Sequence, residues 1–311
     1  MSRPELAVIF GPTGVGKSRA ALEMAAKYDG EIISADSMQV YRMLDIGTAK
    51  PSQEDRDRVR HHLIDLVNPD EDFDAARFVR YAMAALEDIG RRKKRTIVVG
   101  GTGLYFRALL GGLFACPRKD LGLRQRLQEE GEKRGSLALH CKLAEVDQES
   151  AAKVQPQDLY RIVRALEVFH LTGRPLSAHH EEHGFPVQDF RVLKVGLNLD
   201  RSLLYKRIER RAEEMFEKGL VEEVRNLLER GYPPNIRAFR TVTYRPVVNY
   251  LQGKLSFEEA LTKVKTGTKR YAKRQMTWFR PEKDTIWIDV GWPGWEQALA
   301  KELTQFWEDE R

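Results

Sequence analysis

The run Gly11-Pro-Thr-Gly-Val-Gly-Lys-Ser18 constrains the fold of this chain more than any other segment. It fits G-x-x-x-x-G-K-[S/T], and it lies between an apolar strand-like run, Leu6 to Phe10, and a stretch of helical apolar spacing, Ser18 to Tyr28. This strand-loop-helix context separates a phosphate loop from an incidental glycine-rich turn. In such a loop, backbone N–H groups and the Lys17 ammonium surround phosphate oxygens, and the Ser18 hydroxyl can ligate Mg²⁺. The sequence therefore predicts a phosphorylated ligand.

Further strands and helices alternate around this loop. Glu31 to Ala35 and Arg95 to Val99 read as short buried strands, and Asp74 to Arg91 between them has helical apolar spacing. Strand character returns at Val192 to Leu199 and at Asp284 to Val290. Alternation of this kind is typical of a parallel sheet with helices on both faces. We expect an α/β fold in which a P-loop core, with its parallel sheet flanked by helices, carries an all-helical insertion domain.

The insertion is expected where strand patterns disappear. From 118 to 185 the chain is charged and helical in pattern, and it contains no evident strand. We place the first part of the P-loop core at 1–116, the helical insertion at 117–190, and the second part of the core, with basic C-terminal helices, at 191–311.

Composition excludes several classes of protein. Cys116 and Cys141 are the only cysteines, too few for a disulfide framework, and no apolar run is long enough to span a bilayer. The first residues lack the apolar region of a signal peptide. Lys and Arg number 52 against 46 Asp and Glu, a net charge of +6 that permits nucleic-acid binding without requiring it. We expect a soluble, cytoplasmic protein that does not enter a membrane.

Asp36 is the acidic candidate beside the phosphate loop. It follows a predicted strand, whereas the strand 96–99, where an ATPase would carry a Mg²⁺-binding aspartate, runs into Gly100 and Gly101. Ligands of doubly wound sheets bind at the carboxyl ends of the strands, which is where Asp36 would lie. The structural alternative is that Asp36 serves as a helix cap or a turn residue.

Several motifs, taken in order, resemble the bacterial tRNA dimethylallyltransferases, also called tRNA isopentenyltransferases. The segments that carry the resemblance, besides the phosphate loop, are Asp36-Ser-Met-Gln-Val-Tyr41, Asp45-Ile-Gly-Thr-Ala-Lys-Pro51, His61-His-Leu-Ile-Asp65, Val99-Gly-Gly-Thr-Gly-Leu-Tyr105, Arg161-Ile-Val-Arg-Ala-Leu-Glu-Val168 and Ala272-Lys-Arg-Gln-Met-Thr-Trp278. The chain departs from the family pattern at Thr243, where a glycine is common, and at Lys269, where an arginine is more usual.

The resemblance implies an activity and a set of site residues. The family transfers a dimethylallyl group from dimethylallyl diphosphate to N6 of the adenosine 3′-adjacent to the anticodon in tRNA and releases diphosphate. The implied catalytic residues are Asp36, Thr102 and Lys17, and Mg²⁺ is expected on Ser18. The implied diphosphate-binding residues are Gly11, Pro12, Thr13, Gly14, Val15, Gly16, Lys17, Ser18 and Arg211.

The same resemblance implies the residues that contact the anticodon stem-loop of tRNA. They are Asp36, Ser37, Met38, Gln39, Thr102, Arg124, Tyr160, Arg161, Ile162, Val163 and Arg164. The adenine must leave its base stack to reach the other substrate, so base flipping is expected. The resemblance thus makes 1–116 the first part of the catalytic core and 117–190 the tRNA-binding insertion, whose basic side chains suit phosphate contacts. We expect the protein to act as a monomer.

Three alternatives remain open from the sequence. An ATP-dependent small-molecule phosphotransferase, a P-loop kinase, would explain the loop and the sheet, although not the basic helical insertion. An RNA-binding protein with a relict phosphate site would explain the insertion but not the intact Lys17, Ser18 and Asp36. A prenyltransferase that acts on free adenine nucleotides would share the core.

Overall fold

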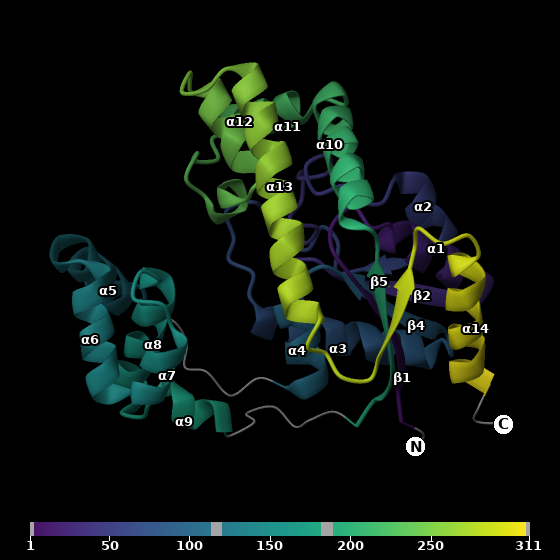
Figure 1. Ribbon diagram of the computed structural model, residues 1–311, viewed down its shortest axis with the longest axis horizontal. Helices are drawn as coiled ribbons and strands as arrows, with labels where there is room; N and C mark the ends of the chain where they lie inside the picture. Colours follow the sequence, from purple (N-terminus) through teal and green to yellow (C-terminus); the bar gives the residue numbers. More distant parts are fainter. Residues whose placement is uncertain (1–2, 113–119, 182–188, 309–311) are drawn as a thin grey trace. The chain divides into compact units, whose positions relative to one another are not determined.

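The computed structural model describes residues 3–112, 120–181 and 189–308 (Figure 1). Cys116 and the expected boundary at 116/117 lie outside these residues. A single sheet of parallel strands runs in the order β3-β2-β4-β1-β5-β6. Its strands are β1 (Glu5–Phe10), β2 (Gly30–Ala35), β3 (His61–His62), β4 (Arg95–Gly100), β5 (Arg191–Asn198) and β6 (Thr285–Asp289). The predicted α/β architecture is confirmed. The two-residue strand β3 was not predicted from the sequence.

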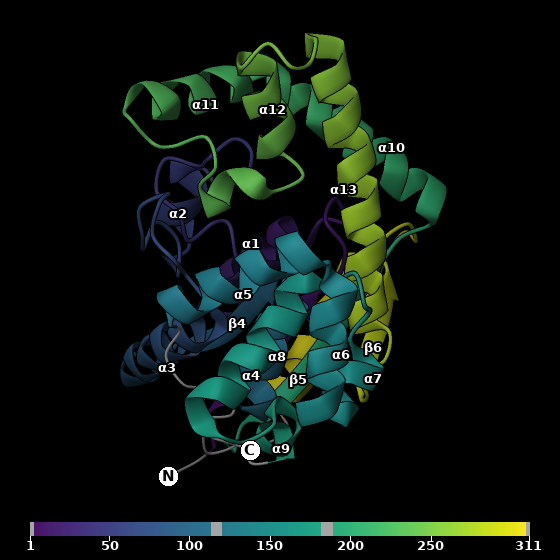
Figure 2. The same ribbon diagram turned by 90° about the vertical axis from the view of Figure 1, so that its left-hand side faces the viewer.

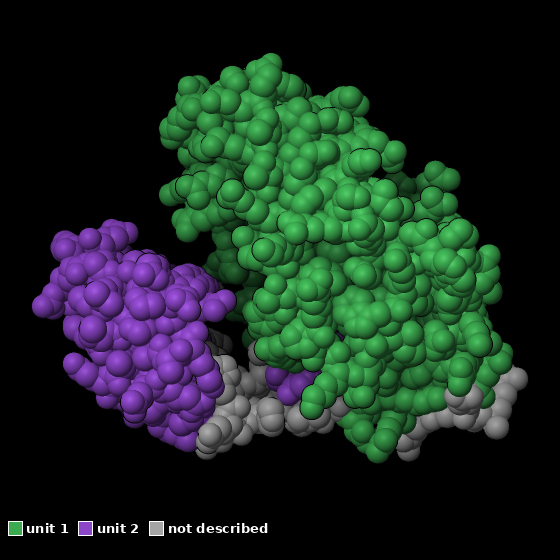
Figure 3. Space-filling model, in the orientation of Figure 1, with its two compact units in different colours: residues 1–108, 189–311 green, residues 109–188 purple. Residues whose placement is uncertain are grey.

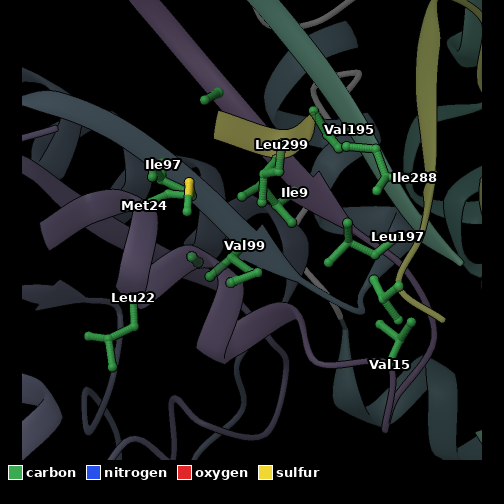
Figure 4. Close-up of a cluster of buried hydrophobic side chains, with 14 of the residues drawn as sticks. Ile9, Val15, Leu22, Met24, Ile97, Val99, Val195, Leu197, Ile288 and Leu299 are labelled. Carbon is green, nitrogen blue, oxygen red and sulfur yellow. The ribbon is translucent and has the colours of Figure 1, made fainter. Parts of the chain in front are cut away.

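Helices cover both faces of the sheet because its strands are apolar on both sides. The face that carries Ile9, Ile97 and Leu197 packs against α1 and α14 in the large core cluster (Figure 4). On the opposite face the Phe10 ring stacks on Phe279 at 4.7 Å between centroids. The helices of the first unit outside the group that follows β5 are α1 (Lys17–Lys27), α2 (Gln53–Arg58), α3 (Ala75–Arg91), α4 (Gly103–Gly111, which extends into the second unit) and α14 (Trp295–Glu308).

A second group of helices follows β5 and lies beyond the carboxyl ends of the strands (Figure 1, Figure 2). Asp200 starts this group as the N-cap of α10, since its carboxylate accepts hydrogen bonds from the Ser202 and Leu203 N–H groups. Ser256 and Glu259 form the capping box that starts α13. The group consists of α10 (Arg201–Glu217), α11 (Leu220–Glu229), the 3₁₀ turn η1 (Arg237–Arg240), α12 (Tyr244–Leu251) and α13 (Phe257–Phe279).

The chain divides into two compact units, coloured separately in Figure 3. The first comprises Met1–Ala108 and Asp189–Arg311, and the second comprises Leu109–Gln188. The second unit therefore starts earlier in the chain than the insertion drawn from sequence at 117–190. Its helices are α5 (Leu121–Arg134), α6 (Ser136–Val146), α7 (Gln148–Lys153), α8 (Leu159–Thr172) and α9 (Leu176–Glu181).

The second unit has a core of its own. Leu139, Leu143, Ile162 and Val163 are at most 1% exposed and pack together from α6 and α8. Glu167 of α8 is fully buried in this unit, and it accepts hydrogen bonds from Arg124, Arg164 and the Asp120 N–H. A buried carboxylate requires such partners, because desolvation of an unpaired charge is costly. Within the described residues, no helix combines the length and apolar character needed to cross a membrane.

Candidate active site

A cavity of about 340 Å³ lies in the first unit, at the carboxyl ends of the parallel strands. Its wall includes the phosphate loop, the segment after β2, the glycines after β4, and residues of α10, the 240–244 segment and α13. Of the residues expected to act, it brings together Thr13, Lys17, Ser18, Asp36, Ser37, Met38, Gln39 and Arg211. Because the ends of parallel strands meet at one edge of a sheet, segments far apart in sequence share this cavity.

The phosphate loop has the conformation that the sequence predicted. Gly14 and Gly16 have positive φ angles of 83° and 108°, which turn the chain so that Lys17 begins α1. The Lys17 ammonium donates a hydrogen bond to the Pro12 carbonyl at 2.8 Å and so lies over the loop. The N-terminus of α1 and the Lys17 ammonium thus face the space where an anion would bind.

Gln275 lines the cavity but was not identified as a site residue from the sequence. Its amide Oε1 accepts a hydrogen bond from the Thr13 N–H at 2.8 Å, and its Nε2 donates to the Gly101 carbonyl at 2.8 Å. A side chain at Gly101 would collide with this amide, since a Cβ there would lie 2.2 Å from Nε2. Gln275 therefore ties α13 to both the phosphate loop and the segment after β4. Its place in the Ala272–Trp278 motif was the available signal.

Asp36 is anchored by one of its two carboxylate oxygens. Oδ1 accepts hydrogen bonds from the Met38 N–H at 2.8 Å and the Gln39 N–H at 3.4 Å. Among the described residues nothing donates to Oδ2, which leaves it available in the cavity. The Thr102 hydroxyl accepts a hydrogen bond from the Ser37 N–H at 3.1 Å. Asp36 thus takes the turn role that the sequence analysis considered, and it keeps an acceptor for a substrate proton.

Among the described residues that line the cavity, positively charged side chains outnumber negatively charged ones. Lys17, Arg211, Arg240 and Arg274 line it, whereas Asp36 is the single carboxylate among the described lining residues. Burial, together with the positive charge of Arg211, lowers the pKa of Lys17 to about 7, an effect that Asp36 opposes. Burial also lowers the pKa of Arg211. Such an excess of desolvated positive charge favours a polyanionic ligand.

Mg²⁺ fits this arrangement. Ser18 lies in the first turn of α1 and its side chain lines the cavity beside Lys17. No group of three His, Cys, Asp or Glu side chains with metal-binding geometry exists in the described part of the chain. Mg²⁺ seldom needs such a cage, because it keeps several waters and binds through one or two protein groups and phosphate oxygens. A hydroxyl next to a phosphate site is therefore a suitable donor.

The residues expected to contact tRNA from the insertion divide into two groups. Tyr160 is 62% exposed and the Arg161 side chain is 63% exposed, so both can contact an RNA. Ile162 and Val163 are core residues, and the expectation that they contact tRNA is corrected for their side chains, which have no surface to offer. The sequence run Tyr160–Arg164 contained them because a helix alternates its exposed and buried faces.

Arg124 and Arg164 also differ from the expectation of free basic groups. Their guanidinium groups bind the buried carboxylate of Glu167, and the Arg124 side chain is 14% exposed. Gln39 is similarly engaged inside the first unit: its Oε1 accepts from the Ser34 hydroxyl, and its Nε2 donates to the Thr48 and Ala49 carbonyls. These side chains organise the segments that carry them.

The two departures from the family pattern are accommodated locally. Thr243 has φ −87° and ψ −50°, a conformation that any residue adopts, so no glycine is needed there. The Lys269 ammonium pairs with Glu209 and lies 5.4 Å from the centroid of the Tyr205 ring. His61 and His62 are hydrogen-bonded to the Val59 carbonyl and to Glu31, respectively.

Known proteins resemble this chain over nearly its whole length. The family model described as IPP transferase matches residues 39–282. A tRNA dimethylallyltransferase of Geobacter metallireducens is 49% identical over 98% of both chains, and tRNA dimethylallyltransferase 1 of Citrifermentans bemidjiense is 51% identical over 96% of both.

Solved structures also resemble the chain. The full-length tRNA isopentenylpyrophosphate transferase of Bacillus halodurans superimposes with a TM-score of 0.73 at 36% identity, over 99% of this chain and 98% of the other. A eukaryotic dimethylallyltransferase acting on tRNA gives a TM-score of 0.81 at 28% identity, over 100% of this chain and 81% of the other.

The lowered pKa of Lys17 predicts a pH-dependent anion site. Below pH 7 the ammonium is charged whether or not an anion is bound. Above pH 7 the free protein must take up a proton to restore the charge, so binding of inorganic diphosphate weakens by up to about tenfold per pH unit until the pKa of the complex is reached.

The Lys17 amine can be titrated directly. Its acetylation by acetic anhydride, measured by peptide mass spectrometry with the exposed Lys153 as internal reference, should have a midpoint near pH 7 that rises when inorganic diphosphate is added. A midpoint near 10.5 in the free protein would contradict the account of the cavity.

Proposed function

The chain belongs to the tRNA dimethylallyltransferase family, and we propose that it transfers a dimethylallyl group from dimethylallyl diphosphate to N6 of the adenosine 3′-adjacent to the anticodon of tRNA. Diphosphate is the other product. The observation that carries the proposal is the cavity in which Lys17 and Arg211 lie with Asp36, the single carboxylate among the described residues that line it. Cations suit the leaving diphosphate, and the carboxylate suits the attacking amine.

Each side of the cavity has its own task in the reaction. The N6 lone pair attacks C1 of the dimethylallyl group while the C1–O bond to diphosphate breaks. Lys17, Arg211 and the N–H groups of the phosphate loop stabilise the negative charge that grows on the leaving oxygen. Arg211 makes no hydrogen bond or ion pair within the described residues, so its planar fork is available for two phosphate oxygens. Mg²⁺ on Ser18 would supply further positive charge to the diphosphate.

Asp36 acts on the amine. Oδ1 is held by the Met38 N–H, which fixes the carboxylate, and Oδ2 takes the N6 proton as the C–N bond forms. Thr102, which is not among the residues lining the cavity, keeps this segment in place by accepting a hydrogen bond from the Ser37 N–H. The flipped adenine would stand next to Ser37 and Met38, both of which line the cavity. A monomer suffices for this chemistry, since one chain supplies all these groups.

An ATP-dependent phosphotransferase explains less of the molecule. It accounts for the phosphate loop and could use Asp36 as a base, but it gives no task to the exposed Tyr160 and Arg161 of the second unit. Transfer to a free adenine nucleotide remains the informative comparison, because it needs the same cavity without an RNA surface.

A direct assay tests the proposed acceptor. The protein, Mg²⁺ and radiolabelled dimethylallyl diphosphate are mixed with unmodified tRNA or with adenosine monophosphate, and the label in each acceptor is counted. We expect label in the tRNA alone. Label in the nucleotide would contradict the RNA acceptor, and label in neither, with folded protein, would contradict the transferase function.

Two arginines of the second unit should respond differently to replacement. Arg161→Ala should weaken tRNA binding and reduce the slope of log K against log salt concentration by about one, as expected for one lost phosphate contact. Arg124→Ala should instead destabilise α5 and α8 by about 1.5–3 kcal/mol, measured by hydrogen exchange, because it removes a partner of buried Glu167. Equal loss of salt slope in both variants would contradict this division.

A further inference from the structure

Glu223 of α11 accepts four hydrogen bonds outside the catalytic groups described above. Its Oε2 accepts from the Asp45 and Ile46 N–H groups, each at 2.7 Å, and its Oε1 accepts from the Gly47 N–H at 3.2 Å. The fourth donor is the Tyr244 hydroxyl of α12, at 2.7 Å from Oε1. Three successive N–H groups that converge in this way form an anion-binding concavity, and here the anion belongs to the protein itself.

Two of the hydrogen-bond partners of Glu223, Gly47 and Tyr244, also lie close to each other. A Cβ added at Gly47 would lie 2.4 Å from Cζ of Tyr244 and 2.9 Å from Cδ1 of Leu220. Only glycine therefore lets the 45–47 segment approach α12 to this distance. Burial, and then the charge of Glu223, raises the pKa of Tyr244 well above its usual value, so the hydroxyl remains a donor.

These contacts join two walls of the active-site cavity. Gly47 and Thr48 line it on one side, and the segment Arg240–Tyr244 lines it on the other. The buried Lys50 ammonium donates to the Asp45 carboxylate within the 44–50 segment, and to the Tyr41 carbonyl and the Asp65 carboxylate outside it, each at 2.6 Å. Lys50 thus ties the segment to its surroundings in the first unit, and Glu223 joins it to the helices α11 and α12.

A chain of hydrogen bonds leads from this segment to Asp36. The Gln39 amide donates to the Thr48 and Ala49 carbonyls, each at 3.4 Å, and the Gln39 N–H donates to Oδ1 of Asp36. The phosphate loop is held separately, by Gln275. A change at Glu223 should consequently reach Asp36 and leave the anion site largely unaffected.

We propose that Glu223, supported by Tyr244, is a positioning residue for the transfer reaction: its carboxylate fixes the 45–48 wall of the cavity and thereby the placement of Asp36. The inference rests on the proposed transferase function. Misplacement of a reacting group by about 1 Å is enough to lower a rate by about 100-fold.

Variants at three positions test the proposal. Glu223→Ala removes all four hydrogen bonds and should lower kcat for tRNA modification by about 10- to 100-fold, with KM for dimethylallyl diphosphate changed less than about twofold. Glu223→Gln keeps one acceptor oxygen and should restore part of kcat, and Tyr244→Phe, which removes one donor, should lower kcat by a smaller factor. Glu222→Ala is the matched control, because Glu222 lies one residue away, its side chain is 63% exposed, and Arg225 is its one ion-pair partner in the described part of the chain.

A readout independent of the chemistry separates positioning from folding. Calorimetry with inorganic diphosphate and Mg²⁺ should give one site per chain and an unchanged Kd in every variant. A fall in kcat matched by an equal fall in the number of diphosphate sites would show that Glu223 merely maintains the fold, and would overturn the proposal. So would a Glu223→Ala enzyme with kcat within twofold of the parent. Absence of transfer by the parent enzyme would instead refute the transferase function.

Discussion

The geometry of the active site depends on the amide of Gln275. It is 5% exposed, and its two hydrogen bonds, to the Thr13 N–H and the Gly101 carbonyl, connect the ends of β1 and β4 to α13. Both backbone groups would cost free energy if left buried without a partner. The strand order places these ends side by side, since β1 and β4 are neighbours in the sheet. The phosphate loop is therefore fixed by a helix that begins more than two hundred residues later in the chain.

The cavity combines an anion site with a carboxylate, and a different element of the fold supplies each of them. The loop between β1 and α1 supplies the anion site, with the charges of Lys17 and Arg211 concentrated where water is partly excluded. The segment after β2 supplies the carboxylate, held by backbone N–H groups. Binding of a diphosphate and removal of a proton therefore depend on separate sets of contacts, and each set can be perturbed while the other remains.

Local sequence signals predicted much of this structure. The phosphate loop and the buried strands have recognisable local patterns, a glycine-rich motif with Lys17 and short apolar runs, so the sequence alone indicates them. The two-residue strand β3 carries no such pattern. The pairing of Arg124 with Glu167 depends on how helices of the second unit pack, which a run of residue types does not specify. Gln275 was visible within a motif, but its partners were set by the fold.

The measurement that tests the division of the cavity most directly uses Asp36→Asn, which retains an oxygen for the Met38 N–H while removing the base. Affinity for inorganic diphosphate and the rate of dimethylallyl transfer to tRNA would be measured on the same preparation. The account predicts that diphosphate binding survives while the rate falls by about 10²- to 10⁴-fold. Loss of diphosphate binding together with transfer, or transfer at the parent rate, would contradict it.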